Sequence, residues 1–508
     1  MDSRAEKLWN RGIQHFRQGD LAAAQASFEA FLARTPGSGP GQFRLSMVAA
    51  RRGRYRAAIA LAEQALQADP GRPEVLTHLA RCHLNAGHLE RARAAATQAQ
   101  AQPRGNSVAL DALGVVMTRL DEQDAALELF DLAIAQDPNQ ASLYFNRALA
   151  NRQFDRIEAA AADLESCLSL QPGHAKALWI LATLRGQDLA GNHLPRLRQR
   201  LALAARADRE TMALALFKEL DDLGESAEAT PLLLQTLSQR AERLPAAGQE
   251  HAALVQGLLN LCDERFVRSP DHTLLENGPV FVIGMPRSGV GLLGQRLSRH
   301  PRFLHLGAQA PFPRLLAAAL GFDGARPPSV SELPRLAEFD FSRLGRDYLA
   351  EVTPAGSRPP ILCESHPLNY LQVGLIARAL PHARFLHVVR DPVDTCVSLL
   401  AQPGAEPLLA TQDPAALAEC YHDYQRLMQH WHEVLPGRIM DVSYESLVEK
   451  PEMILRVICS FLGIRYASSL RLGLQLHGRS LGRGYRYVNA LPGLREGLTP
   501  DARQSRSA

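Results

Sequence analysis

Two short segments carry residue types that could bind an anion. The first, residues 281–293, is an apolar run that breaks into the turn Met-Pro-Arg-Ser-Gly at 285–289 and then resumes with helical character. A strand that leads into a glycine-containing turn at a helix start points several backbone N–H groups, and the positive end of the helix dipole, at one place outside the sheet. This pattern predicts a phosphate-binding turn. The alternative is an ordinary connection between a strand and a helix.

The second segment, residues 385–398, ends an apolar run at Arg390 and carries a hydroxyl group at Ser398. An arginine fork can bind a phosphate through two hydrogen bonds. Ser398 lies eight residues further on, about two helical turns into the next element, so both groups can reach one anion. The alternative is that Arg390 and Asp391 form a salt bridge and a cap at a helix N-terminus.

The elements around these segments alternate between strand and helix. Strands are predicted at 279–284, 360–363, 384–389 and 438–443, and helices at 290–299, 310–320, 369–380, 391–401, 414–434 and 451–463. This alternation implies an α/β domain with a parallel sheet covered on both faces. Ligands of such sheets bind beyond the carboxyl ends of the strands, where both segments lie.

The N-terminal part of the chain repeats itself. Prolines stand at 36, 70, 138 and 172, a period of 34 residues (70 minus 36), with Pro103 one residue out of register. A small residue and a bulky one recur before them, as in Gly12 and Phe28. The pattern resembles the tetratricopeptide repeat family over about residues 5–185, as five helix pairs and a closing helix. We expect three parts: a repeat solenoid at 1–185, a helical connector at 186–270 and a second domain at 271–508.

Repeats of this kind stack into a superhelix with a concave groove. We expect the groove to hold a protein or peptide. The alternative is that the repeats only stabilise or dimerise the second domain. The oligomeric state is left open.

Composition excludes several classes of protein. A formal charge of +3 on 508 residues gives no electrostatic support for a general nucleic-acid or membrane-surface role. The N-terminus lacks an apolar export core, and no apolar run approaches the roughly 18 residues needed to span a bilayer, so we expect a cytoplasmic protein. The 7 cysteines include no Cys-x-x-Cys pair, which argues against a disulfide framework and a zinc knuckle.

Three motifs occur together in the second half: Pro-Arg-Ser-Gly at 286–289, Arg-Asp-Pro at 390–392 followed by Ser398, and the segment 444–451, which begins with Tyr444. Together they resemble the sulfotransferase family over about residues 275–465. More narrowly, the chain is similar to bacterial proteins that join tetratricopeptide repeats to a domain like that of tyrosylprotein sulfotransferases. The expected fold is therefore an all-α solenoid followed by an α/β, P-loop-like sulfotransferase domain with a central parallel sheet.

The resemblance implies a donor, 3′-phosphoadenosine 5′-phosphosulfate (PAPS), and transfer of its sulfuryl group to an alcohol or phenol without a metal. It assigns residues of the turn and of the two later motifs to donor binding: Pro286, Arg287, Ser288, Gly289, Val290, Gly291, Arg390, Ser398 and Tyr444. The turn would hold the 5′-phosphosulfate, and Arg390 with Ser398 the 3′-phosphate. Arg287 would also be catalytic, because it neutralises charge that develops as the sulfuryl group leaves.

The chain departs from this family at several places. Val290 and Gly291 stand where relatives carry hydroxyl residues, residues 307–310 read Gly-Ala-Gln-Ala where a catalytic Glu is expected, and the usual Lys is missing from the segment 363–367. The segment from His477 to Tyr487 is also shorter than the usual 3′-phosphate clamp.

A different base is available in this chain. We hypothesise that His366 takes the proton of the acceptor and that Glu364 orients the His366 ring. An imidazole suits this role because its pKa lies close to neutral pH. The alternative is that His366 only ends a strand and forms local hydrogen bonds. Two other functions are open: a catalytically degenerate scaffold that binds partners through its repeats, and a P-loop kinase. The kinase is disfavoured because the turn lacks the Gly-Lys-Ser/Thr that holds nucleotide phosphates and Mg²⁺.

Overall fold

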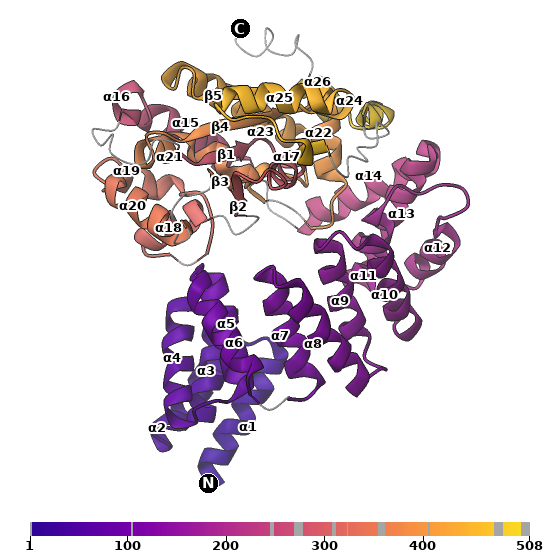
Figure 1. The fold of residues 1–508 in the computed structure, drawn as a ribbon. Helices are drawn as coiled ribbons and strands as arrows, with labels where there is room; N and C mark the ends of the chain where they lie inside the picture. The colour runs from indigo at the N-terminus through magenta and orange to yellow at the C-terminus, as the bar shows by residue number, and fades with distance from the viewer. Residues whose placement is uncertain are drawn as a thin grey trace. The chain divides into compact units, whose positions relative to one another are not determined.

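The computed structural model describes residues 3–102, 105–243, 248–268, 278–306, 311–322, 324–353, 361–404, 407–471 and 481–498. The expectations that concern Pro103, residues 307–310 and His477 lie outside these ranges. The chain divides into two compact units, residues 1–184 with the short segment 321–324, and residues 185–320 with 325–508. The first is all-α and the second carries a parallel sheet, which confirms the predicted fold class (Figure 1).

The first unit is built of successive antiparallel helix pairs. Its helices are α1 (Ser3–Gln18), α2 (Leu21–Arg34), α3 (Gly39–Arg51), α4 (Tyr55–Ala68), α5 (Pro73–Ala86), α6 (Leu89–Gln100), α7 (Ser107–Arg119), α8 (Gln123–Gln136), α9 (Ala141–Gln153), α10 (Ile157–Leu170) and α11 (Ala175–Leu184). Five pairs and a closing helix match the predicted repeats, and the periodic prolines follow the second helix of a pair.

Small residues let the two helices of a pair approach closely. A Cβ added to Gly12 would lie 2.7 Å from the ring of Phe28, and one added to Gly114 would lie 3.0 Å from the ring of Phe130. Phe28 and Phe130 are fully buried. The aromatic ring of the second helix therefore packs directly on the glycine of the first helix, where a larger residue would clash. This packing explains why the two residue types recur with the period of the repeat.

The second unit is built around one five-stranded parallel sheet in the order β2-β3-β1-β4-β5. The strands are β1 (Val280–Ile283), β2 (Phe303–His305), β3 (Ile361–Glu364), β4 (Arg384–Val389) and β5 (Ile439–Ser443). The register of the central pair aligns Val280 with Arg384 and Ile283 with His387. All carboxyl ends therefore lie at one edge, where the turn after β1 and Arg390 after β4 are neighbours.

The two faces of the sheet bury different side chains. On one face, Val280 and Val282 pack with Leu386, with Leu293 of α17 (Val290–Leu297) and with Ile458 of α25 (Pro451–Phe461). The opposite face is aromatic.

On that aromatic face, Phe281 stacks on Phe385 with ring centroids 5.8 Å apart, and it contacts Phe312 of α18 (Pro311–Ala319) and Tyr348 of α20 (Phe341–Val352). The alternation of side chains along β1 sets this division.

Helices between and after the strands complete the unit. The remaining ones are α19 (Leu333–Leu336), α21 (Val373–Ala379), α22 (Pro392–Leu400), α23 (Pro414–Val434), α24 (Tyr444–Glu449) and α26 (Pro492–Leu498). A short 3₁₀ helix at Pro367–Gln372 precedes α21.

The segment expected as a connector packs against this sheet domain. It forms α12 (Leu194–Ala202), α13 (Arg206–Leu223), α14 (Ser226–Arg243), α15 (Gln249–Leu261) and α16 (Glu264–Val267). Arg240 of α14 is fully buried and donates to the carbonyl oxygens of Leu400, at 2.9 Å, and Gln402. His251 of α15 pairs with the hydroxyl of Tyr370 at 2.9 Å. These helices therefore belong to the second compact unit.

All seven cysteines are free and buried. Among the residues that the structure describes, none of the helices has the length and apolar character needed to cross a bilayer.

Candidate functional site

The turn after β1 is held in a conformation that glycine alone tolerates at two positions. Gly284 has φ of +152° and Gly289 has φ of +111°. A Cβ added to Gly289 would lie 2.5 Å from the ring of Tyr444, and one added to Gly284 would lie 2.6 Å from the carbonyl oxygen of Val388. The turn is therefore pressed against neighbouring backbone and an aromatic ring, with its amides before the start of α17.

Ser288 places an unpaired hydroxyl inside this turn. The residue is 1% exposed, and among the described residues its Oγ has no hydrogen-bond partner. Buried polar atoms of this kind are costly unless a ligand, ion or water completes them. The position of the hydroxyl in a turn of backbone amides is suited to an oxyanion such as a phosphate.

Arg287 stands at the tip of the turn with φ of +73°, a left-handed conformation that is uncommon for arginine. Its Nε donates to Ser398 Oγ at 3.0 Å. Desolvation and the positive charge of Arg390 lower the pKa of Arg287. Because the side chain also keeps an exposed surface, the guanidinium remains charged at neutral pH.

Arg390 leaves the end of β4 and points toward the same place. Its Nη1 donates to the carbonyl oxygen of Arg287 at 3.0 Å, and its guanidinium lies 4.8 Å from the ring centroid of Tyr444. The structure therefore brings Arg287, Arg390, Ser398 and Tyr444 together. The sequence predicted the turn and Arg390 at the carboxyl ends of strands, and Tyr444 was expected here by the resemblance alone.

Asp391 and Asp394 have structural roles next to this cluster. Asp391 caps α22 by accepting from the amide of Asp394 at 2.9 Å, as the alternative interpretation of this motif foresaw. The ion pair of Arg390 is made instead with Asp394, at 3.7 Å. Capping and anion binding are compatible, since the Arg390 guanidinium still reaches the turn.

The helix that follows the turn, α17, begins with Val290 and Gly291, which have no hydroxyl group that could bind a ligand. The side chain of Val290 is buried in the core below the sheet face, so only its backbone can face a ligand. Gly291 lies next to open space, because a Cβ added there would meet no heavy atom within 4 Å. The amide of Gly291 and the space beside it are thus available at the N-terminus of α17.

The segment after residue 481 is anchored beside α22. The amides of Gly482 and Gly484 each donate to Asp394 at 2.7 Å. Tyr485 donates to Asp391 at 2.9 Å.

The arginines of this segment are engaged elsewhere. Arg483 pairs with Asp221 and Asp222 of α13, and Arg486 also contacts Asp221. Both arginines therefore bind carboxylates of α13. The expectation of a shortened 3′-phosphate clamp stays a prediction.

Glu364 and His366 do not form the pair that we hypothesised. Glu364 is fully buried, and it accepts from Asn369 Nδ2 at 2.7 Å, from the amide of Phe312 at 3.3 Å and from the hydroxyl of Tyr348 at 3.4 Å. Within the described residues, His366 Nδ1 is buried without a hydrogen-bond partner. The hypothesis that Glu364 orients His366 is therefore wrong. The Glu364 carboxyl group instead faces the aromatic layer formed by neighbouring helices.

Both groups have shifted proton affinities. Burial raises the pKa of Glu364 to about 7, against the opposing effect of its hydrogen bond from Asn369. Desolvation lowers the pKa of His366, so its imidazole is neutral at neutral pH and able to accept a proton. His366 follows β3, the strand next to β1, and therefore lies at the same edge of the sheet as the turn.

A further chain of contacts behind the turn was not expected from the sequence. The amide of Met285 donates to the hydroxyl of Tyr424 in α23, and that hydroxyl pairs with His387 Nε2 on β4. His387 Nδ1 in turn lies 2.7 Å from Asp441 Oδ1 on β5. The only signal in the sequence was a histidine inside the apolar run of β4.

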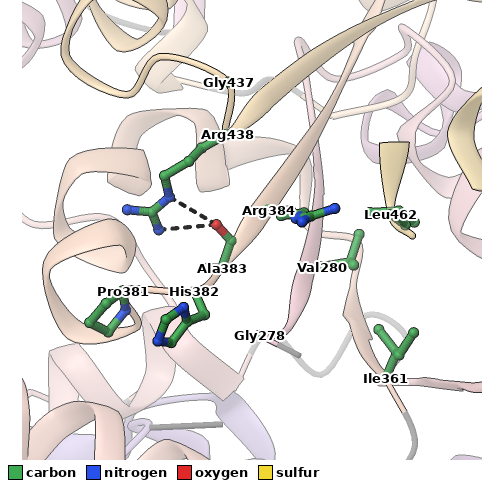
Figure 2. A pocket seen from close by; sticks show the side chains of 10 residues that line it. All are labelled: Gly278, Val280, Ile361, Pro381, His382, Ala383, Arg384, Gly437, Arg438 and Leu462. Carbon is green, nitrogen blue, oxygen red and sulfur yellow. Dashed lines mark hydrogen bonds between the residues drawn. The ribbon is translucent and has the colours of Figure 1, made fainter. Parts of the chain in front are cut away.

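A cavity of ≈ 240 Å³ lies at the opposite edge of the sheet, among the residues labelled in Figure 2. It is formed at the amino ends of the strands, where Val280, Ile361 and Arg384 begin β1, β3 and β4. Arg438 is turned toward the main chain there and donates to the carbonyl oxygen of Ala383. This cavity is separate from the turn, because the two lie at opposite ends of the strands.

Comparison with known sequences identifies both halves of the chain. Residues 279–468 match the sequence model of the sulfotransferase family. Residues 10–73, 49–116 and 141–174 match models of the tetratricopeptide repeat. The resemblance inferred from the motifs is therefore confirmed: tetratricopeptide repeats precede a segment of the sulfotransferase type.

Several curated proteins are similar over part of their length. An uncharacterized protein of Aquifex aeolicus (strain VF5) is 28% identical over 263 residues, covering 50% of this chain and 34% of that protein. Protein-tyrosine sulfotransferase 2 of Gallus gallus is 25% identical over 253 residues, covering 48% of this chain and 64% of that protein. The protein-tyrosine sulfotransferase of Drosophila melanogaster is 26% identical, covering 36% and 38%. The chain thus spans about a third to two thirds of the length of these relatives.

Two solved structures overlap parts of the chain. The sulfotransferase domain from the curacin biosynthetic pathway has a TM-score of 0.27 at 16% identity and covers 40% of this chain and 78% of its own. YrrB, described as a tetratricopeptide repeat protein with an unusual peptide-binding site, has a TM-score of 0.27 at 15% identity and covers 43% and 98%.

Proposed function

We propose that the chain is a sulfotransferase that uses PAPS as donor and transfers its sulfuryl group to a hydroxyl acceptor. The observation that carries this proposal is the convergence of Arg287 and Arg390 on the turn that holds the unpaired hydroxyl of Ser288. PAPS carries one anionic group at each end of its ribose. A turn of amides beside two guanidinium groups is suited to such a molecule.

We assign the residues the following roles in this proposal. The amides of 285–291 and Ser288 hold the 5′-phosphosulfate, while Arg390 and Ser398 hold the 3′-phosphate and Tyr444 supports the guanidinium of Arg390. As the acceptor oxygen bonds to sulfur, the bond from sulfur to the 5′-phosphate breaks and negative charge grows on the leaving phosphate. Arg287 lies beside this position and neutralises that charge.

The proton of the acceptor hydroxyl needs a base, and His366 is the group that we assign to it. Its pKa is lowered by desolvation, which favours the neutral form that accepts a proton. Glu364 does not take this role, because its oxygens are buried and accept from Asn369, Phe312 and Tyr348. His366 therefore acts without a carboxylate partner in this proposal.

We further propose that the acceptor is a protein or peptide that the repeats recruit. Tetratricopeptide repeats expose a concave helical surface that commonly binds peptides or helices. The repeat matches and the similarity to protein-tyrosine sulfotransferases support this choice.

The test has two stages. Calorimetry with 3′-phosphoadenosine 5′-phosphate measures donor-site binding, and release of this product from PAPS in the presence of tyrosine peptides measures turnover. Binding together with turnover supports the proposal, and Arg287→Met should abolish the turnover. Binding without turnover, or no binding at all, contradicts it and favours a scaffold that acts through its repeats alone.

A further inference from the structure

Three side chains that could bind a metal ion meet beside the two strands at one side of the sheet. His387 and Asp441 are direct partners in the register of β4 and β5, so their side chains leave the sheet on the same face. His387 Nδ1 lies 2.7 Å from Asp441 Oδ1, and His432 Nε2 lies 3.0 Å from the same oxygen. The ligand atoms of all three residues lie within 4.8 Å of one another.

Each member of this cluster is positioned by a different element. His387 belongs to β4, Asp441 to β5, and His432 to the last turn of α23. The His387 ring is fixed from behind by the hydroxyl of Tyr424 on its Nε2. A hydrogen bond to the second ring nitrogen is the usual device that orients a metal-binding histidine.

The cluster is also open to ions from solution. The side chain of His387 is only 7% exposed, whereas those of His432 and Asp441 are 39% and 55% exposed. The site would therefore lie at the surface, with His387 as a buried ligand and His432 and Asp441 as accessible ones. Water would fill the remaining coordination positions.

The spacing is compatible with a small ion. Two ligands of a tetrahedral Zn²⁺ lie about 2 Å from the metal and therefore roughly 3.3 Å from each other. The present separations of 2.7 and 3.0 Å are those of hydrogen bonds to Asp441. An outward movement of the exposed Asp441 side chain by roughly half an ångström would open the space.

We propose that His387 Nδ1, His432 Nε2 and a carboxylate oxygen of Asp441 bind one divalent transition-metal ion. Two imidazoles and a carboxylate favour zinc among the abundant ions, while hard ions such as Mg²⁺ prefer oxygen ligands. The seven cysteines are buried and therefore offer no competing thiolate at the surface. The proposal is independent of sulfuryl transfer.

A short chain of hydrogen bonds connects the proposed metal site to the turn at 285–289. An ion on His387 Nδ1 places the ring proton on Nε2, next to the Tyr424 hydroxyl, and that hydroxyl already accepts from the amide of Met285. Two hydrogen bonds thus separate the proposed ion from the first residue of the turn.

The test uses the full chain without a histidine tag, stripped of metal with a chelator that is then removed. Titration with ZnCl₂ against a chromophoric chelator gives the affinity and the stoichiometry, and Co²⁺ gives a visible spectrum that reports nitrogen and oxygen ligands. We expect one tight ion per chain. His432→Gln should weaken binding by at least about tenfold, since loss of even an outer-shell partner costs 10- to 100-fold.

Matched variants make the result decisive. His432 and Asp441 are exposed, so His432→Gln and Asp441→Asn should retain the circular dichroism spectrum of the parent. His15→Gln, on α1 of the other unit, removes a histidine that does not belong to the cluster and should leave zinc affinity unchanged. Equal affinity in the parent, His432→Gln and Asp441→Asn would overturn the proposal. So would the absence of tight binding, because the cluster would then be a carboxylate bridging two imidazoles.

Discussion

Arg390 Nη1 donates a hydrogen bond of 3.0 Å to the carbonyl oxygen of Arg287. This contact ties the end of β4 to the tip of the turn after β1 and holds two guanidinium groups near each other. Their mutual repulsion is unfavourable unless an anion lies between them. Desolvation and the nearby charge of Arg390 both lower the pKa of Arg287, because each disfavours its protonated form.

Replacement of Arg390 by lysine tests the geometry of this contact separately from its charge. Lys keeps the positive charge, but its single nitrogen cannot reproduce the two spaced, planar donor sites with which a guanidinium can reach the carbonyl of Arg287 and a phosphate. We expect affinity for 3′-phosphoadenosine 5′-phosphate to fall by about 2 kcal/mol, roughly 30-fold, as measured by calorimetry. Arg384→Lys, at the start of the same strand, is the control and should bind like the parent. An equal loss in both variants would argue against a specific role for Arg390.

Gly291 offers a gain-of-affinity test. A side chain added there meets open space, and Gly291 lies in the first turn of α17, directly after the turn at 285–289. Gly291→Thr should restore a hydroxyl donor to the 5′-phosphate and tighten nucleotide binding by about 1 kcal/mol, roughly fivefold. Gly291→Val has the same shape without the hydroxyl and serves as the control. If both variants bind alike, the hydroxyl does not reach the phosphate.

The sequence predicted the elements that carry strong local signals. The strand at 384–389 and the helix at 414–434 were predicted with the bounds that the structure has. The strand is mostly apolar, with His387 as the polar residue inside the run, and the helix begins with Asp413 and Pro414 at its cap. The three-residue strand Phe303–His305 was missed, since a run so short has no periodicity. The helix predicted at 369–380 divides into a 3₁₀ helix and α21.

The candidate site was predictable where it depends on strand ends. The alternation of strands and helices placed Arg287 and Arg390 at the carboxyl ends of parallel strands, on one edge of the sheet. That β1 and β4 are direct neighbours comes from the strand order, which the sequence did not reveal. The surroundings of Glu364 were not predictable, because Phe312 and Tyr348 reach it from helices whose packing the sequence does not reveal. The pairing of His387 with Asp441 could not be predicted either, because it depends on the register of β4 and β5.

Glu364 makes the stability of the second unit dependent on pH. Its folded-state pKa is raised by burial to about 7, above the ordinary value of 4.5. Between these values the folded state binds the proton and the unfolded state does not, so stability is greatest below pH of about 4.5 and declines as the pH rises through about 7. The total effect is about 3 kcal/mol. Glu364→Gln should remove this decline, because its amide does not titrate.

The measurement needs a signal from the second unit alone. Trp431 is fully buried there, so Trp9→Phe and Trp179→Phe leave its fluorescence as the reporter of urea unfolding. Free energies of unfolding are compared at several pH values with those of Glu364→Gln. Glu338→Gln, at an exposed position of the same unit, is the control and should keep the pH dependence of the parent. The same slope in Glu364→Gln would show that another group titrates.

His366→Gln separates proton transfer from donor binding. Gln has no titratable nitrogen, so turnover should fall by about 10²- to 10⁴-fold, the usual contribution of a general base. The affinity for 3′-phosphoadenosine 5′-phosphate should stay unchanged, since His366 is not assigned to the nucleotide. The pKa of His366 is lowered by desolvation, so the neutral imidazole persists in mild acid and the acid limb of kcat in the parent should lie below pH of about 6.5.

His305→Gln is the neighbouring control, because the His305 ring contacts Ser365 at 2.7 Å. Loss of nucleotide binding in His366→Gln would instead place the imidazole at the donor, and unchanged turnover would leave the acceptor proton to another group.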